Sequence, residues 1–239
     1  MTIDTGKLRK QVILSADRPD MLADCLSSQG YCTVSFSAAE IVSPYLSKHP
    51  DMFMCKMGAK DDAPVISYQD DEQNRYPGFG PLSAEYPGDI AYNAACTGRF
   101  LLHNLQYTAA HIIDFAEKSG MTMVNVRQGY AKCSTVIVDD RSIITYDRGM
   151  AKACTAAGMD VLTISPGHIV LPGYDTGFIG GTSGRAGDTI YFNGDLSSHP
   201  DSKDIIAFIT ERGLSVRFFE EWPLTDIGSV ITTCKASPL

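Results

Sequence analysis

The chain has 239 residues, of which 44% are hydrophobic and 20% charged, and its formal net charge at pH 7 is -8. This length and composition allow one substantial core, so we expect a single domain over residues 1–239, and the acidic balance argues against a nucleic-acid partner. No window approaches the roughly 20 apolar residues that a membrane-spanning helix needs, and the first ten residues lack the apolar run of a secretion signal. We therefore expect a cytoplasmic protein without a membrane partner.

The amino-terminal part begins with a predicted strand over residues 11–17, a helix over 19–30 and a strand that starts at Cys32. The helix ends at Gly30, since glycine is the usual residue just past a helix end. Three later glycines stand between a helix-like stretch and an apolar strand in the same way: Gly120, Gly158 and Gly213. This self-similarity indicates an internal repeat, in which each unit buries its apolar face against a neighbour.

A predicted hairpin comes next, with strands over residues 53–58 and 63–70. The helix expected after it is replaced by residues 74–87, where several prolines and glycines exclude regular structure. Long loops of this kind are often functional, so residues 74–87 are a candidate lid over a site. The alternative is a surface excursion that merely replaces the lost helix.

Three complete units follow, each with the order strand, strand, helix, strand. Their first strands are predicted over residues 91–98, 134–140 and 177–184. Their second strands end on Asn104, Asp147 and Asp195, which are side chains that accept hydrogen bonds from the free amides at a helix start. The glycine-rich stretch from Gly177 lies in a predicted hairpin, which excludes a phosphate loop and indicates close backbone approach instead.

The two ends of the chain each carry part of a fifth unit. Residues 11–17 lack a first strand, whereas residues 226–234 form a first strand without a partner. Pairing them closes a ring and removes exposed sheet edges. The sequence therefore predicts an α/β fold, a closed five-unit β/α propeller with pseudo-fivefold symmetry. The alternative is an open sheet of four units with stray end strands.

Five charged residues stand just before the predicted first strands: Asp51, Asp89, Lys132, Asp175 and Asp226. Under fivefold symmetry these side chains converge at one mouth of the central channel. Carboxylates gathered in a partly dry cavity raise one another's pKa unless a cation compensates them. A guanidinium or amino ligand fits this arrangement, with bidentate carboxylate pairing as the strong mode. The alternative is that Asp stands there only because it caps turns well.

Two segments carry a resemblance to a known family: Pro87 to Ile90, and Asp226 to Cys234 with its terminal cysteine. With the fivefold repeat, they resemble the pentein, or guanidino-group-modifying, superfamily of dimethylarginine dimethylaminohydrolases, deiminases and amidinotransferases. The segments DIAYN, QGYAKCS, GFIGG and DIGS are similar to those of an uncharacterised bacterial branch. The resemblance implies that Asp89 holds a substrate guanidinium and that Cys234 is the nucleophile of a hydrolase or amidinotransferase.

One departure from the family concerns the catalytic histidine, because Ala131 or Lys132 occupies its place. Cys133 is a rival nucleophile to Cys234, since a neighbouring ammonium can lower the pKa of a thiol. Free cysteines are also common as small buried apolar residues. Two functions therefore remain open: a cysteine-dependent enzyme acting on guanidines, or a non-catalytic pentein that binds a small cationic metabolite or a protein partner.

The candidate site residues divide into two groups. The candidate catalytic residues are Cys234, Cys133 and Lys132, and the candidate substrate-binding residues are Asp89, Asp51, Asp175, Asp226 and Asn93. His49 and His199 each open a His-Pro-Asp triplet, which we interpret as a repeated turn element. The seven cysteines include no CxxC pair, which indicates reduced thiols rather than disulfides or a zinc site. We expect no metal or other cofactor, and the oligomeric state stays open.

Overall fold

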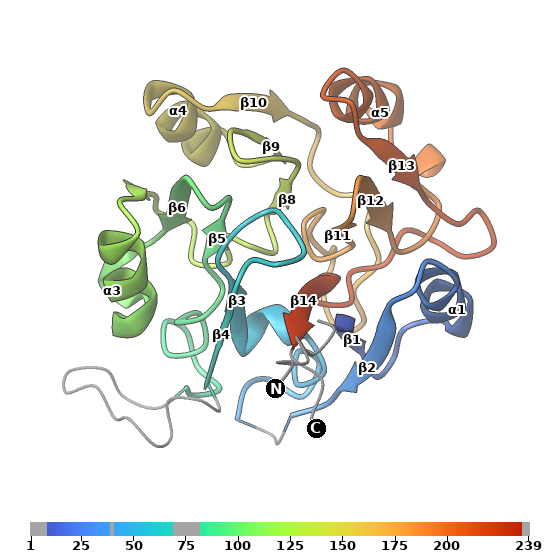
Figure 1. The fold of residues 1–239 in the computed structure, drawn as a ribbon, viewed down its shortest axis with the longest axis horizontal. Coiled ribbons are helices and arrows are strands. Elements are labelled where there is room, and N and C mark those ends of the chain that lie inside the picture. Colours follow the sequence, from blue (N-terminus) through green and yellow to red (C-terminus); the bar gives the residue numbers. More distant parts are fainter. Residues whose placement is uncertain (1–8, 39–40, 69–81, 236–239) are drawn as a thin grey trace, which may run out of the picture.

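The computed structural model describes residues 9–38, 41–68 and 82–235. These residues form five small sheets, four with three strands and one with two. The sheets lie around a common centre, and the helices lie on the outside of this arrangement (Figure 1).

The first sheet joins the two ends of the chain. Its strands are, in spatial order, β14 (Ile231–Lys235), β1 (Arg9–Ser15) and β2 (Cys32–Phe36), and α1 (Asp20–Ser28) connects the last two. β1 pairs antiparallel with β14, with Gln11 opposite Thr233, and parallel with β2. The terminal pairing expected from the sequence is therefore confirmed.

The other sheets repeat this pattern. The second is the antiparallel hairpin of β3 (Met54–Lys56) and β4 (Val65–Ser67). The third contains β5 (Ala95–Cys96), β6 (Phe100–His103), α3 (Ala110–Lys118) and β7 (Thr122–Asn125). The fourth contains β8 (Thr135–Ile137), β9 (Ser142–Thr145), α4 (Arg148–Ala156) and β10 (Asp160–Thr163). The fifth contains β11 (Ser183–Ala186), β12 (Thr189–Phe192), α5 (Ser202–Thr210) and β13 (Ser215–Arg217). In each of these three-stranded units the first two strands are antiparallel and the last two parallel.

The four repeated glycines terminate the helices as predicted. Their φ angles lie in the left-handed region, at +86° for Gly30, +67° for Gly120, +90° for Gly158 and +73° for Gly213. No described atom lies within 4 Å of the place where a Cβ would stand at these glycines. Backbone conformation rather than space therefore requires glycine there.

The predicted helix starts are confirmed at one position and displaced at two. The Asp147 carboxylate accepts from the amide of Met150, at 2.8 Å, at the start of α4. Asn104 and Asp195 instead precede the short 3-10 helices η2 (Leu105–Tyr107) and η3 (Leu196–Ser198). The α-helix of each of these two units begins only after that extra turn.

The first strand of each unit lies on the inside of the arrangement. β5 contacts both β3 and β8, and β11 contacts both β8 and β14. Between the remaining pair, the amide of Asp51 donates to the carbonyl of Gly228, at 3.2 Å. The helices cover the outside with apolar residues one turn apart, such as the buried Ile205 and Ile209 of α5.

The first strands begin later than the sequence predicts. Residues 177–178 are irregular and residues 179–182 form a turn in place of the expected strand, and β11 starts only at Ser183. The glycines of this stretch do permit close approach. A Cβ on Gly180 would stand 2.2 Å from the carbonyl oxygen of Lys132, and one on Gly184 would stand 1.9 Å from that of Val230. The expectation of close backbone contact is therefore confirmed.

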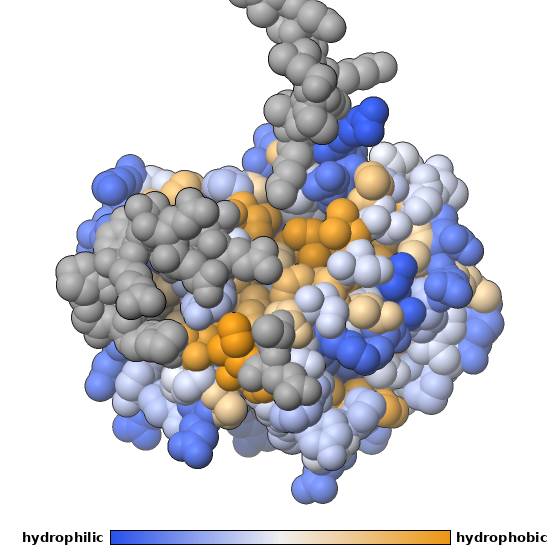
Figure 2. All heavy atoms as spheres, turned by 90° about the horizontal axis from the view of Figure 1, so that it is seen from below, coloured by the Kyte–Doolittle hydropathy of each residue, from blue (hydrophilic) through white to orange (hydrophobic). Residues whose placement is uncertain are grey.

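The surface carries an apolar area among polar side chains on the face shown in Figure 2. β2 lies on this side of the molecule (Figure 1), and its Val34 is 38% exposed. Over the parts of the chain that the structure covers, no helix has both the length and the apolar character needed to cross a membrane.

Candidate functional site

The structure does not place the five predicted charged residues equivalently. Asp51 and Asp226 are buried near the centre, Asp89 is buried beside an aromatic ring, and Asp175 is exposed. The reason is the uneven length of the turns before the first strands. Asp51 lies in the short 3-10 helix η1 (Pro50–Met52) just before β3, whereas a longer segment, 176–182, separates Asp175 from β11. Asp175 therefore does not join the other carboxylates.

A hydrogen-bond chain through Ser229 links the central carboxylate to the central lysine. The Ser229 hydroxyl donates to Asp51 Oδ2 at 2.5 Å, and Lys132 Nζ donates to Ser229 Oγ at 2.8 Å. Lys132 Nζ also donates to the carbonyl of Gly180 at 3.1 Å. Burial lowers the pKa of Lys132, while the charge of Asp51 acts in the opposite direction. The ammonium of Lys132 is thus an internal counterion for the carboxylates.

Cys133 belongs to the same network through the side chain of Asn93. Asn93 Nδ2 donates to Cys133 Sγ at 3.0 Å, and the thiol lies 3.3 Å from Asp51 Oδ2. Asn93 Oδ1 accepts from the amides of Lys132 and Cys133, at 3.0 and 3.1 Å, which fixes the turn before β8. Burial raises the pKa of the Cys133 thiol well above its usual value. Lys132 acts in the direction expected from the sequence, but burial outweighs it.

Asp226 lies beside this network and contacts a histidine. Its Oδ1 accepts from the amide of Gly228 at 3.0 Å and lies 3.6 Å from His49 Nδ1. Its Oδ2 accepts from the amide of Phe178, also at 3.0 Å. Burial raises the pKa of Asp226, and the charge of Asp51 adds to this effect, whereas His49 opposes it.

An acidic-aromatic cluster, formed by Asp89, Tyr130, Phe178 and Tyr146, lies next to Asp226. The Tyr130 hydroxyl donates to Asp89 Oδ2 at 2.7 Å. The Tyr130 and Phe178 rings stack with centroids 6.1 Å apart, and those of Phe178 and Tyr146 with centroids 5.8 Å apart. Asp89 is only 4% exposed, and its Oδ1 is buried without any hydrogen-bond donor from the described part of the chain. Burial raises its pKa.

The two candidate nucleophiles lie in different surroundings. Cys133 is 4% exposed and joins the central network, whereas Cys234 is half-buried on β14 and stands opposite Lys10 in the strand pair. Of the candidate lid, residues 74–81 lie outside the described ranges. Tyr86 at its end is 55% exposed, with its ring centroid 6.1 Å from that of Tyr130.

Sequence reasoning missed two residues of the site, Ser229 and His49. Ser229 has a φ of +74°, a left-handed conformation that is strained for a residue other than glycine and often marks a functional position. His49 contacts Asp226 in addition to opening a turn. Its backbone also packs tightly on Gly228, because a Cβ on that glycine would stand 2.3 Å from the Cα of His49. A serine after a strand-opening glycine gives no chemical signal in the sequence. Among the residues that the structure covers, no three histidine, cysteine or acidic side chains are grouped as metal ligands.

The fold and the site define an α/β protein with a buried, charged centre. Residues 13–231 match the model of a family of unknown function, DUF6873, and the chain belongs to this family. No curated protein sequence matches it significantly. Among solved structures, it is similar to a cysteine-to-serine variant of agmatine deiminase from C. jejuni with substrate bound, at 7% identity and a TM-score of 0.48, over 100% of this chain and 99% of that chain. It is also similar to C. jejuni agmatine deiminase at 7% identity and a TM-score of 0.45, over 89% and 87% of the two chains.

Proposed function

We propose that residues 1–239 form one domain, a closed five-unit β/α propeller of the pentein type with pseudo-fivefold symmetry. The pairing of β1 with β14 supports this proposal, because it makes one unit from the two ends of the chain. The contacts between neighbouring first strands and the recurring left-handed glycines support it as well.

We propose that this domain binds a small cation, a guanidino or amino compound, at the acidic-aromatic cluster. The observation that carries the proposal is the buried Oδ1 of Asp89, to which no described residue donates. Leaving a buried carboxylate oxygen unpaired is costly, and a guanidinium compensates it with charge-assisted hydrogen bonds. The rings of Tyr130, Phe178 and Tyr146 add faces that attract a cation.

The remaining carboxylates take unequal parts in this proposal. Asp51 Oδ1 is also buried without a donor from the described ranges, which leaves one further acceptor for a ligand that reaches the centre. Asp226 is engaged by two backbone amides. Asn93 is engaged by Cys133 and its neighbours, and we assign it a positioning role. The exposed Asp175 contributes only a screened charge at the rim.

Binding without chemistry is the function that the thiols support best. Burial keeps Cys133 in its thiol form, and the side chains that its sulfur contacts in the described part of the chain are Asn93 and Asp51 rather than a histidine that could move protons. A second candidate function, cysteine-dependent hydrolysis or amidino transfer on a guanidine, rests on the 3.3 Å approach of Cys133 Sγ to Asp51 Oδ2. There, Asp51 accepts the thiol proton while the sulfur attacks the guanidinium carbon, and the bound cation itself favours the thiolate. Asp51 then returns that proton to the departing ammonia or amine as its C–N bond breaks, and water or an acceptor amine takes the carbon from the sulfur.

Calorimetric titration with agmatine, which carries both a guanidino and an amino group, tests the binding proposal. We expect saturable binding that Asp89→Asn weakens by about 1.5 to 3 kcal/mol, the range for a charge-assisted hydrogen bond. The matched control is Asp175→Asn, which removes the same charge at an exposed, screened position and weakens binding by less than about 0.5 kcal/mol. Equal affinities for the protein and Asp89→Asn exclude this site.

Thiol labelling separates the two candidate functions. Chloroacetamidine, a reactive guanidine-like probe, labels Cys133 selectively if that thiol is a nucleophile, and agmatine then protects it. If Cys133 is only buried, the exposed Cys32 reacts first and Cys133 stays unmodified. Labelling located by mass spectrometry, together with an assay for released ammonia or amine, decides between them.

A further inference from the structure

The centre of the molecule holds a cavity that the acidic-aromatic cluster does not use. Its volume is about 40 Å³, and the first strands supply its walls. Its lining includes Lys56, Lys132 and Arg185, together with Ser183, and contains no aspartate or glutamate among the described residues. We call this space the lysine cavity.

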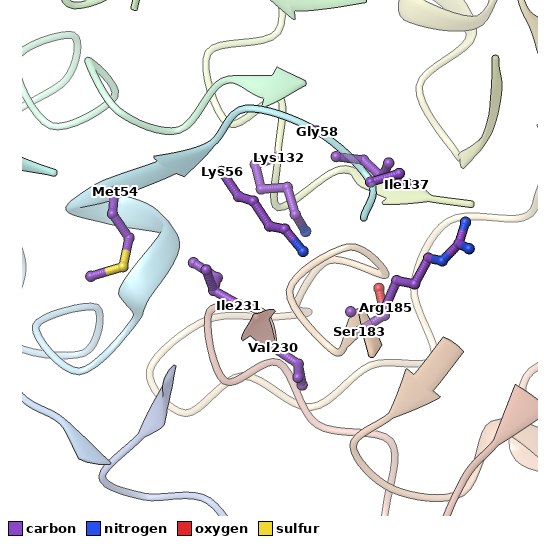
Figure 3. Close-up of a pocket in the computed structure, with 11 residues that line it drawn as sticks. Met54, Lys56, Gly58, Lys132, Ile137, Ser183, Arg185, Val230 and Ile231 are labelled. Atoms are coloured by element: carbon purple, nitrogen blue, oxygen red, sulfur yellow. The ribbon is translucent and has the colours of Figure 1, made fainter. Parts of the chain in front are cut away.

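Two of the three basic side chains point into the lysine cavity. Figure 3 shows the ammonium ends of Lys56 and Lys132 turned toward the same space, whereas the side chain of Arg185 turns away. The Arg185 guanidinium is engaged outside, where it donates to the carbonyls of Val138 at 3.0 Å and Gly187 at 2.8 Å. The two lysines therefore dominate the charge inside.

Within the described ranges, only neutral atoms accept hydrogen bonds from the two ammonium groups. Lys56 Nζ donates to Thr232 Oγ1, and Lys132 Nζ donates to Ser229 Oγ and to the carbonyl of Gly180. An ammonium group has three N–H donors, so these bonds leave N–H donors on both lysines for a further acceptor.

The carboxylates that influence these lysines are already bonded elsewhere. Asp61 accepts from the hydroxyl of Tyr31 at 2.5 Å and from the amide of Gly187 at 3.0 Å. Asp51 reaches Lys132 only through Ser229. The two ammonium groups therefore face one space that no carboxylate of the described residues lines, so an anion placed there would meet two positive charges.

We propose that the lysine cavity binds a small oxyanion, a carboxylate or phosphate group, between Nζ of Lys56 and Nζ of Lys132. A cavity needs about 10–15 Å³ to hold one water molecule, so about 40 Å³ accommodates a group of a few heavy atoms. Lysine binds such groups as a point charge. Burial lowers the pKa of Lys56 to about 8; the charge of Asp61 opposes this effect, whereas the charges of Arg185 and Lys132 add to it, which agrees with further positive charge around the cavity. This proposal is independent of the cation site, because other residues carry it.

Calorimetric titration with inorganic phosphate, and separately with sodium formate, tests the inference in a buffer without oxyanions and at constant ionic strength. We expect saturable binding of one of the two probes, which shows whether the site takes phosphate or carboxylate. Lys56→Met removes the charge but keeps the length of the side chain, and we expect it to weaken binding about tenfold or more. The control, Lys152→Met, changes an exposed lysine on α4 and leaves the affinity as it was. Absence of saturable binding by either probe, or equal binding by Lys56→Met, overturns the proposal.

A second measurement needs no variant and covers the case in which Lys56→Met fails to fold. Crystals of the unaltered protein are soaked in selenate, a tetrahedral oxyanion with an anomalous signal. We expect a selenium peak between the ammonium groups of Lys56 and Lys132. Peaks confined to the protein surface overturn the assignment of the cavity.

Discussion

The acidic-aromatic cluster and the lysine cavity belong to the same ring of strands but obtain their side chains differently. Asp89 and Tyr130 come from the turns that precede first strands, whereas Lys56 comes from a first strand itself. Lys132 takes part in the lysine cavity and in the central hydrogen-bond network, not in the acidic-aromatic cluster itself. Its amide bonds Asn93 Oδ1 beside Cys133, while its ammonium lines the cavity. The comparison shows that the carboxylate of the first region comes from a turn and Lys56 of the second from a strand, while Lys132 links the second region to the central carboxylate Asp51.

The largest effect is expected when this link is removed. Lys132→Met leaves the fully buried Asp51 without its counterion, and we expect the free energy of unfolding to fall by about 3 kcal/mol. Urea denaturation measures this loss. Lys152→Met, at an exposed position, changes stability by less than about 0.5 kcal/mol.

A double variant shows whether the loss comes from charge. Asp51→Asn in the Lys132→Met background removes the uncompensated carboxylate, so part of the stability returns. If Lys132→Met denatures at the same urea concentration as Lys152→Met, Lys132 is not the counterion that links the lysine cavity to Asp51.

The contact between β11 and β14 offers a way to break the ring itself. A Cβ on Gly184 would stand 1.9 Å from the carbonyl oxygen of Val230, and rigid backbone cannot give way cheaply. We expect Gly184→Ala to lower the free energy of unfolding by about 3 kcal/mol. Gly149→Ala is the matched control, because that glycine lies in α4 and its Cβ would meet only the tip of Asp147, at 3.2 Å. Equal denaturation midpoints for the two variants contradict the tight contact.

Most of this architecture follows from patterns that the sequence displays. The helix-ending glycines, the order of strands within a unit and the pairing of residues 11–17 with 226–234 depend on local conformation and on unpaired strand edges. Both properties can be recognised from the order of residues along the chain. The predicted start of this strand at Gly177 was wrong, because β11 begins at Ser183 and glycines suit a turn as well as a strand.

The site was less accessible to sequence reasoning, because it depends on where turns place side chains. Asp89 and Asp175 look alike before their strands, but one is buried beside Tyr130 and the other is exposed. Ser229 gains its position from a left-handed backbone, and Lys56 gains its importance from a cavity formed by several units. Neither property is local in sequence.

Opposite pH dependences are expected for the two regions. Cation binding at Asp89 needs its carboxylate ionised, so affinity falls as the pH drops through the raised pKa of Asp89. Anion binding needs Lys56 protonated, so affinity falls as the pH rises through about 8. Beyond each pKa, every further pH unit lowers the affinity about tenfold. The charge of Asp61 raises the pKa of Lys56, whereas those of Arg185 and Lys132 lower it. The pH at which oxyanion affinity is half lost therefore reports the net effect of these three charges. Parallel pH profiles for agmatine and for the oxyanion contradict the distinction between the regions.

The smallest effect concerns the hydroxyl that holds Asp89. Tyr130→Phe removes the donor to Asp89 Oδ2 but keeps the ring on Phe178, so we expect the free energy of unfolding to fall by about 1 kcal/mol. A carboxylate that loses a donor to its charged form is protonated at higher pH. The pH at which agmatine affinity is half lost therefore shifts upward in Tyr130→Phe. Tyr174→Phe, on a ring that is 46% exposed, leaves that pH unchanged. An unshifted midpoint in Tyr130→Phe means that the titrating group is not Asp89, and the cation site then has to be sought at the other carboxylates of the centre.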